Sequence, residues 1–196
     1  TINGCAPWPG VTACIGGHTL RLLQADSCGA EQAPATVSRE GVIGCSGGAV
    51  LLLDAGDTFQ GGIESNLSEG VLVVDAYNAL GYDALAIGNH EFDYGALDTV
   101  SGDGAPPDMR GALKAAAARA RFPFLAANLI DEATGHPVAW PNVRPSTLVD
   151  TASLRVGIVG VMTYDGLTKT LAANVQGLGT APLAPTVEAE ARQLRQ

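Results

Sequence analysis

Short apolar segments, each ended by a polar or turn-forming residue, constrain the fold of this chain most strongly. Ala49–Leu53 and Ala84–Ile87 are continuous apolar runs of strand length, typical of strands buried on both faces of a sheet. Between them, apolar residues recur at helical spacing from Leu67 to Leu80. Ser68 is the expected N-cap of that helix, and Gly81 is expected to end it. The chain therefore alternates strand and helix.

The same alternation continues toward the end of the sequence. We expect further strands at Thr19–Gln24, Phe124–Ala127, Thr147–Thr151 and Arg155–Gly160, and helices at Gly111–Arg121 and Glu188–Gln196. Repeated strand, loop and helix predict an α/β architecture with a buried sheet. An irregular segment rich in Cys, Gly and Pro (residues 1–18) is expected to precede one domain spanning residues 19–196.

Composition excludes several classes of protein. The chain has 196 residues, of which 46% are hydrophobic, so global disorder is excluded. No apolar run approaches the ~18–20 residues needed to cross a bilayer. Lys and Arg number 11 and Asp and Glu 20, giving a net charge of −9, which argues against nucleic acid or an anionic membrane as the main partner. A phosphate ligand stays compatible with this charge, because bound metal ions can reverse the local field.

The cysteines indicate the compartment. Cys5, Cys14, Cys28 and Cys45 all lie in the first quarter of the chain. Their even number and clustering favour disulfides and a secreted, extracellular or periplasmic location, with reduced structural thiols as the alternative. Their spacing does not form the CxxC pairs of a structural zinc site. The tripeptide Asn66-Leu67-Ser68 is a glycosylation sequon for a eukaryotic secretory pathway.

Polar residues follow three of the expected strands. Asp26, Asp57 and the pair Asn89-His90 each come just after a strand, where open α/β sheets place their ligand crevice. Carboxylate, amide and imidazole groups are ligands for divalent metals, and a pair of metals can activate water for phosphoryl transfer. Taken singly, each of these residues is more often a turn or cap residue. Their combination predicts a metal-dependent site.

The surrounding segments resemble a known family. The 5'-nucleotidase family of calcineurin-like metallophosphoesterases has a second metal-binding block that resembles Leu51–Gly61 (LLLDAGDTFQG). Its signature block resembles Gly88–Gly95 (GNHEFDYG) together with the preceding Asn78–Ala84. Further segments that fit are Phe122–Leu129, Val156–Thr163, Thr168–Thr170 and Asn174-Val175. The match runs from about Leu20 to the end of the sequence.

The resemblance implies a four-layered α/β/β/α sandwich of the metallophosphoesterase type, of which this chain would hold the N-terminal portion. It also implies two divalent metal ions, with Zn, Mn, Mg and Ca not distinguished. The implied metal ligands are Asp26, Asp57 as the bridging carboxylate, and Asn89. His90 and Asp93 match the catalytic dyad, and Asn128 is expected near the substrate.

The sequence departs from the family pattern at two points. Cys28 stands where the family normally has a metal-binding His. A thiolate can bind zinc but suits Mg²⁺ or Mn²⁺ poorly, and a disulfide-bonded Cys28 could bind no metal, so a structural Cys28 is favoured. The family's later histidines and its nucleoside-binding domain have no counterpart before Gln196, because His18 and His136 lie outside the ligand blocks. The missing half of the site is expected from a longer polypeptide or a second chain.

Three functions follow from these residues. The first is a metal-dependent phosphohydrolase of the 5'-nucleotidase type, which converts nucleoside 5'-monophosphates or related phosphoesters to nucleoside and phosphate by attack of activated water. The second is a catalytically impaired module with a binding or structural, assembly-forming role. The third keeps the metal centre but uses a different phosphoester or a sulfur ester. Neither nucleic acid nor a transmembrane segment is expected.

Overall fold

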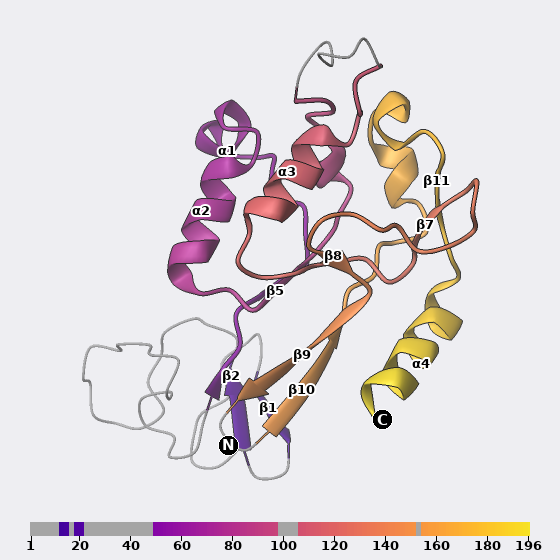
Figure 1. Cartoon of the computed structure of the whole chain (residues 1–196). Coiled ribbons are helices and arrows are strands. Elements are labelled where there is room, and N and C mark those ends of the chain that lie inside the picture. Colours follow the sequence, from indigo (N-terminus) through magenta and orange to yellow (C-terminus); the bar gives the residue numbers. More distant parts are fainter. Residues whose placement is uncertain (1–11, 16–17, 22–48, 98–105, 152–153) are drawn as a thin grey trace. The chain divides into compact units, whose positions relative to one another are not determined.

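The computed structural model describes residues 12–15, 18–21, 49–97, 106–151 and 154–196 (Figure 1). They belong to two compact units. The first comprises Thr1–Leu53 and Val149–Val156, and the second comprises Asp54–Leu148 and Gly157–Gln196. The predictions for Asp26, Cys28 and the disulfides fall on residues or side chains outside the described part.

The described part of the first unit contains a small sheet of three strands. Strand β1 (Thr12–Ile15) runs antiparallel to β2 (His18–Arg21), with Thr12 opposite Arg21. Strand β3 (Ala49–Val50) runs parallel to β2. Strand β1 lies inside the segment that the sequence predicted to be irregular. Four residues show too little alternation to indicate a strand, and only the pairing with β2 makes them one.

The second unit is built on a four-stranded sheet with the order β4-β5-β6-β8. Its strands are β4 (Leu53–Asp54), β5 (Ala84–Ala86), β6 (Phe124–Leu125) and β8 (Val143–Arg144). Strand β6 runs parallel to both β5 and β8. The apolar run Ala49–Leu53, predicted as one strand, is divided between β3 and β4. The predicted α/β architecture is confirmed.

The helices of this unit follow the predicted spacing with shifted starts. Helix α2 (Val71–Leu80) ends at Gly81 as predicted, and Gly81 adopts a left-handed φ of 76°. It begins after Gly70 and not at Ser68, because Gly70 adopts a φ of 82° and a Cβ there would overlap the Phe59 ring. The short α1 (Ile63–Leu67) precedes it and was not predicted. Helix α3 (Gly111–Arg119) confirms the predicted alanine-rich helix and lies beside α2 (Figure 1).

The last part of the chain supplies a strand pair, a second small sheet and a helix. Strands β9 (Ser146–Thr151) and β10 (Leu154–Val159) pair as predicted. Strands β7 (Leu129–Asp131) and β11 (Leu178–Thr180) pair antiparallel and were not predicted, because three-residue strands far apart in sequence leave no local pattern. Helix α4 (Leu183–Leu194) begins five residues before the predicted Glu188, since Pro182 and Pro185 are compatible with a first helical turn.

The hydrophobic core of the second unit lies between the sheet and helices α2 and α3. The Phe59, Phe92 and Phe124 side chains are at most 1% exposed. Helix α3 buries the face that carries Ala112, Leu113, Ala116 and Ala117. The described part of the unit also contains three short 3₁₀ helices, η1 (His90–Phe92), η2 (Gly166–Lys169) and η3 (Ala172–Val175). Within the described part of the chain, none of the helices combines the length and apolarity that a membrane crossing requires.

Candidate active site

Two loops that follow neighbouring strands touch through glycines. Gly56 follows β4 and has a left-handed φ of 93°, and Gly88 follows β5. A Cβ built on Gly56 would lie 2.5 Å from the Gly88 nitrogen and 2.6 Å from the Ala86 oxygen. A Cβ on Gly88 would overlap the Asp57 carboxylate. The loops can approach this closely only because both positions lack a side chain.

Asp57 is held in an uncommon backbone conformation at this contact. Its φ is 62°, a left-handed value that non-glycine residues rarely adopt and that costs on the order of 1–3 kcal/mol. Its Oδ1 accepts a hydrogen bond from the His90 backbone N–H at 3.1 Å. Its own N–H donates to Glu91 Oε2 at 2.9 Å. Both ends of Asp57 are therefore fixed by the loop that carries Asn89 and His90.

Glu91 is a buried carboxylate that joins the two loops. Its side chain has no exposed surface. Oε2 accepts hydrogen bonds from the N–H groups of Asp57 and Gly88, at 2.9 and 2.7 Å. Oε1 accepts from the N–H and hydroxyl of Thr58, at 2.7 and 3.0 Å. Burial raises the pKa of the Glu91 carboxyl, and the hydrogen bonds from Thr58, Asp57 and Gly88 oppose that rise.

Sequence reasoning assigned no role to Glu91, although it lies inside the signature segment. A glutamate in a polar loop is usually exposed, and the sequence carries no signal that the backbone would close over it.

His90 and Asp93 form a hydrogen-bonded pair across the single turn of η1. His90 Nδ1 lies 2.6 Å from Asp93 Oδ2. The side chain of His90 is 38% exposed and that of Asp93 is 19% exposed, so part of the imidazole reaches solvent. The hydrogen bond to Asp93 raises the pKa of His90, burial opposes the rise, and the Asp93, Asp57 and Glu91 carboxylates favour it. The structure thus places the two predicted dyad residues together.

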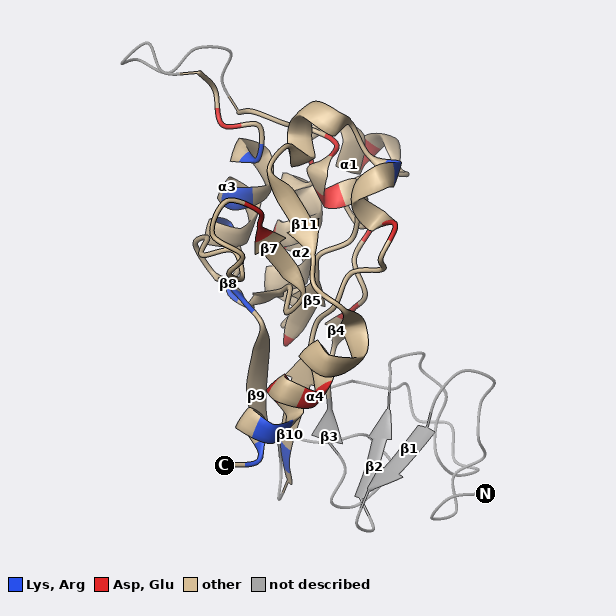
Figure 2. Cartoon of the chain, turned by 90° about the vertical axis from the view of Figure 1, so that its right-hand side faces the viewer, with Lys and Arg blue, Asp and Glu red and all other residues tan. Residues whose placement is uncertain are grey.

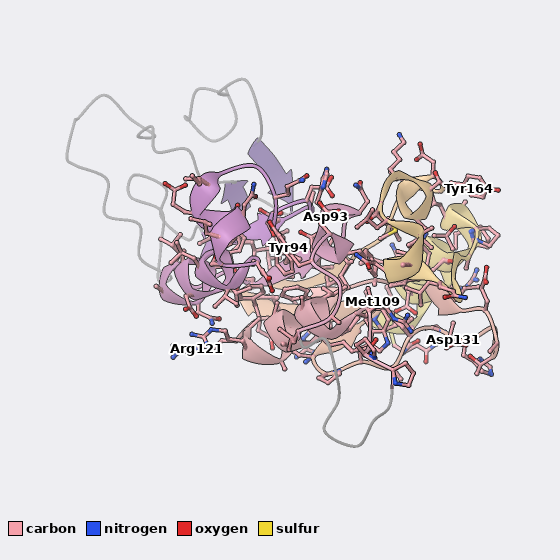
Figure 3. All side chains as sticks on the ribbon, turned by 90° about the horizontal axis from the view of Figure 1, so that it is seen from above. Asp93, Tyr94, Met109, Arg121, Asp131 and Tyr164 are labelled. Carbon is pink, nitrogen blue, oxygen red and sulfur yellow. The ribbon has the colours of Figure 1, made fainter. Side chains whose placement is uncertain are left out.

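Two residues from distant elements support this turn. Thr170 directly follows η2, and its hydroxyl donates to Asp93 Oδ1 at 3.2 Å. Asp93 is labelled in Figure 3, next to Tyr94. The Asn174 side chain, on η3 and 2% exposed, donates to the Phe92 carbonyl at 2.6 Å. Both residues lie in segments that resembled the family, yet no local pattern offered a functional reason to single them out.

The predicted ligands Asp57 and Asn89 offer oxygen donors at the same loop contact. Asn89 directly precedes η1, and Asp57 bonds the next residue, His90. A carboxylate and an amide oxygen are donors that hard divalent cations accept. These residues fit as part of a metal site. Among the described residues, no group of three His, Cys, Asp or Glu side chains could complete it.

Asn128 has a structural contact in the described chain. It is fully buried, its Nδ2 donates to the Met162 carbonyl at 2.9 Å, and its Oδ1 accepts from the Met162 N–H at 2.8 Å. Both amide groups are therefore occupied, and the substrate contact expected of Asn128 stays a prediction.

Asn66 lies on α1, where its Oδ1 accepts from the Gly61 N–H at 3.1 Å and the Tyr94 hydroxyl at 3.2 Å. Asn66 is exposed, and its glycosylation also stays a prediction.

Curated relatives are similar to this chain over part of its length. No family model matches the chain. It is 37% identical over 116 residues to the snake venom 5'-nucleotidase of Gloydius brevicauda, a match that covers 59% of this chain. It is 38% identical over 111 residues to the 5'-nucleotidase of Diplobatis ommata and 32% identical over 123 residues to protein UshA of Escherichia coli. These matches cover 57% and 63% of this chain. The chain covers only 18%, 17% and 19% of the lengths of these three relatives.

Solved structures share the fold. The calcineurin-like phosphoesterase YfkN of Bacillus subtilis superposes with a TM-score of 0.54 at 21% identity, over 75% of this chain and 45% of that one. The fold is therefore that of the calcineurin-like phosphoesterases. A 5'-nucleotidase precursor from Thermus thermophilus superposes with a TM-score of 0.58 at 27% identity, over 74% of this chain and 25% of that one. Over the matched residues, the chain is similar to proteins of the 5'-nucleotidase family of calcineurin-like phosphoesterases, which confirms the resemblance that the sequence indicated.

Proposed function

We propose that this chain forms part of a metal-dependent phosphohydrolase that releases phosphate from nucleoside 5'-monophosphates or related phosphoesters. The observation that carries the proposal is the His90–Asp93 pair, 2.6 Å apart, on the loop whose His90 N–H also bonds Asp57. The identity to relatives named 5'-nucleotidase supports the choice of substrate class.

The residues of the site have separate tasks in this proposal. Asp57 and Asn89 would hold divalent metal ions, together with Asp26 and with ligands from a longer polypeptide or a second chain. Two such ions, when bound, supply charge neutralisation and water activation. His90 Nε2 would donate to a phosphoryl oxygen as negative charge develops there. Asp93 would keep a proton on His90 Nδ1 and stabilise the positively charged ring.

A secreted, extracellular or periplasmic location accompanies this proposal. The four clustered cysteines support it, as do relatives whose names place them in snake venom. The net charge of −9 supports a small phosphoester substrate in preference to nucleic acid.

A catalytically impaired module with a binding or assembly role is the second candidate function. Cys28 favours it, because a thiol there would weaken or remove one ligand of the first metal site. This candidate predicts nucleotide binding without turnover.

The test is turnover of adenosine 5'-monophosphate by the full-length protein, first stripped with a chelator and then supplied with Zn²⁺, Mn²⁺, Mg²⁺ or Ca²⁺. We expect phosphate release with at least one metal, and a loss of about 10²–10⁴-fold in kcat for His90→Asn. His136→Asn is the matched control, because His136 is exposed and lies outside the site. Wild-type kcat in His90→Asn would refute the assigned role. Nucleotide binding without turnover in the wild type would establish the second candidate.

A further inference from the structure

We propose that Glu91 is a positioning residue whose single carboxylate sets the Asp57 loop against the Asn89-His90 loop, so that divalent-cation binding depends on it. This inference rests on the proposed function, because it concerns the same metal site. Glu91 itself is buried, touches neither substrate nor metal in the proposal, and acts through its neighbours.

The four hydrogen bonds to Glu91 come from both loops. Asp57 and Thr58 lie on the loop after β4, and Gly88 lies on the loop after β5. Oε2 bridges the loops directly, since it accepts from Asp57 and Gly88 together. Oε1 fixes the next residue of the first loop through both donors of Thr58. One rigid planar group therefore sets the distance between the two loops.

This bridge acts at the point where the loops touch. Gly88, which donates to Oε2, is also the residue at which a Cβ would overlap the Asp57 carboxylate. The left-handed φ of Asp57 would relax if its N–H lost the Glu91 acceptor. Relaxation would move the Asp57 carboxylate relative to Asn89, and hence separate the two predicted metal ligands.

The contacts require an acceptor at both oxygens. Three of the four donors are backbone N–H groups, which cannot reverse their polarity. A glutamine at this position keeps the volume but turns an NH₂ group toward one of the two donor pairs. Glu91→Gln therefore breaks the bridge with the least change in packing.

The experiment measures Mn²⁺ binding to the chelator-stripped full-length protein by isothermal titration, with no substrate present. We expect Glu91→Gln to weaken the Mn²⁺ Kd by about 10–100-fold, the usual effect of removing a group that orients metal ligands. Hydrogen exchange should accelerate at the amides of Asp57, Thr58 and Gly88 in the same variant. The expected readout does not depend on catalytic activity.

Asn142→Asp is the matched control for general destabilisation. The Asn142 side chain is part-buried and donates to the carbonyls of Ala117, Ala120 and Phe122. It precedes β8, at the opposite end of the parallel strands from the site. Its replacement by Asp loses a comparable set of hydrogen bonds without touching Asp57, Asn89 or Glu91. We expect a lower melting temperature with an unchanged Mn²⁺ Kd.

The outcomes separate this inference from the function on which it rests. A folded Glu91→Gln protein with a Kd within twofold of wild type overturns the positioning role, whereas the proposed function survives if the wild type binds Mn²⁺ and releases phosphate. A wild type that neither binds a divalent metal nor turns over substrate overturns both. If Glu91→Gln fails to fold, Thr58→Val decides: it removes only the hydroxyl donor, and an unchanged Mn²⁺ Kd would refute the proposal.

Discussion

At the scale of single residues, the candidate site combines an exposed polar pair with a buried carboxylate. His90 presents part of its ring to solvent while Asp93 holds the other side. Both oxygens of Asp93 are engaged, one by His90 and one by the Thr170 hydroxyl. The carboxylate therefore has little freedom to rotate away from the imidazole, and the ring orientation is set before any ligand arrives.

The His90–Asp93 pair predicts a pH dependence in the metal-free protein. The hydrogen bond that His90 donates to Asp93 raises the pKa of folded His90 above its ordinary value of 6.5. The stability that this pair contributes is fully present below pH 6.5, and it is lost as the pH rises through the raised pKa of folded His90. We expect an NMR titration of the His90 ring to show a raised pKa that falls toward 6.5 in Asp93→Asn. An unchanged His90 pKa in that variant would contradict the assignment.

At the scale of secondary-structure elements, short helices far along the chain support the loop after β5. The η1 turn is bonded by Thr170 after η2 and by Asn174 on η3, which lie 77 and 82 residues away from their respective partners Asp93 and Phe92. Gly95 leaves room for this contact, because a Cβ there would lie 3.1 Å from the Asn174 Oδ1. The orientation of the dyad therefore depends on tertiary contacts.

Thr170→Val tests this support. Removing the hydroxyl leaves Asp93 Oδ1 without its Thr170 donor, and we expect kcat of the full-length enzyme to fall about tenfold with little change in KM. Thr170→Ser should restore the rate, because it keeps the hydroxyl. Thr168→Val is the control, since the Thr168 hydroxyl bonds only the nearby Asp165 carbonyl. Equal rates for Thr170→Val and wild type would show that the contact does not orient Asp93.

At the scale of the whole molecule, acidic residues outnumber basic ones. In Figure 2 the ribbon is coloured as basic on α3, near β8 and toward the end of α4, among other places, and as acidic at positions on several other elements. Several cations are paired, including Arg119 with Asp75 at 2.6 Å and Lys114 with Asp108 at 2.6 Å. The net charge of −9 favours the binding of divalent cations and disfavours the binding of anions. An anionic phosphoester is favoured at the site only after a bound metal ion has reversed the local field.

Metal binding at the candidate site predicts a thermal shift of the full-length protein. A ligand that binds only the folded state at about 100 times its Kd stabilises that state by about 2.7 kcal/mol. Mn²⁺ should therefore raise the Tm of the wild type, whereas K⁺ at equal ionic strength should not. Asp57→Asn should abolish most of the Mn²⁺ shift, because it removes the bridging carboxylate of the proposed site. The same Mn²⁺ shift in Asp57→Asn and wild type would place the bound cation elsewhere.

Much of the fold was predictable because its signals are local. The helical spacing that ends at Gly81, the alanine-rich helix that begins at Gly111 and the buried runs that begin at Ala84 and Phe124 each depend on neighbouring residues. The shifted start of α2 was not predictable, since it depends on the Phe59 ring beneath Gly70. Strands β7 and β11 were missed for the same kind of reason, because each becomes a strand only by pairing with the other.

The amino-acid sequence was sufficient to reveal the resemblance to 5'-nucleotidases, the α/β class and the segments that carry Asp57, Asn89, His90 and Asp93, because these are properties of contiguous residues. The burial of Glu91 with four donors, and the support of the η1 turn by Thr170 and Asn174, became apparent only in the folded chain. Burial and long-range hydrogen bonds depend on how distant segments close over one another, and no local pattern of side chains encodes that closure.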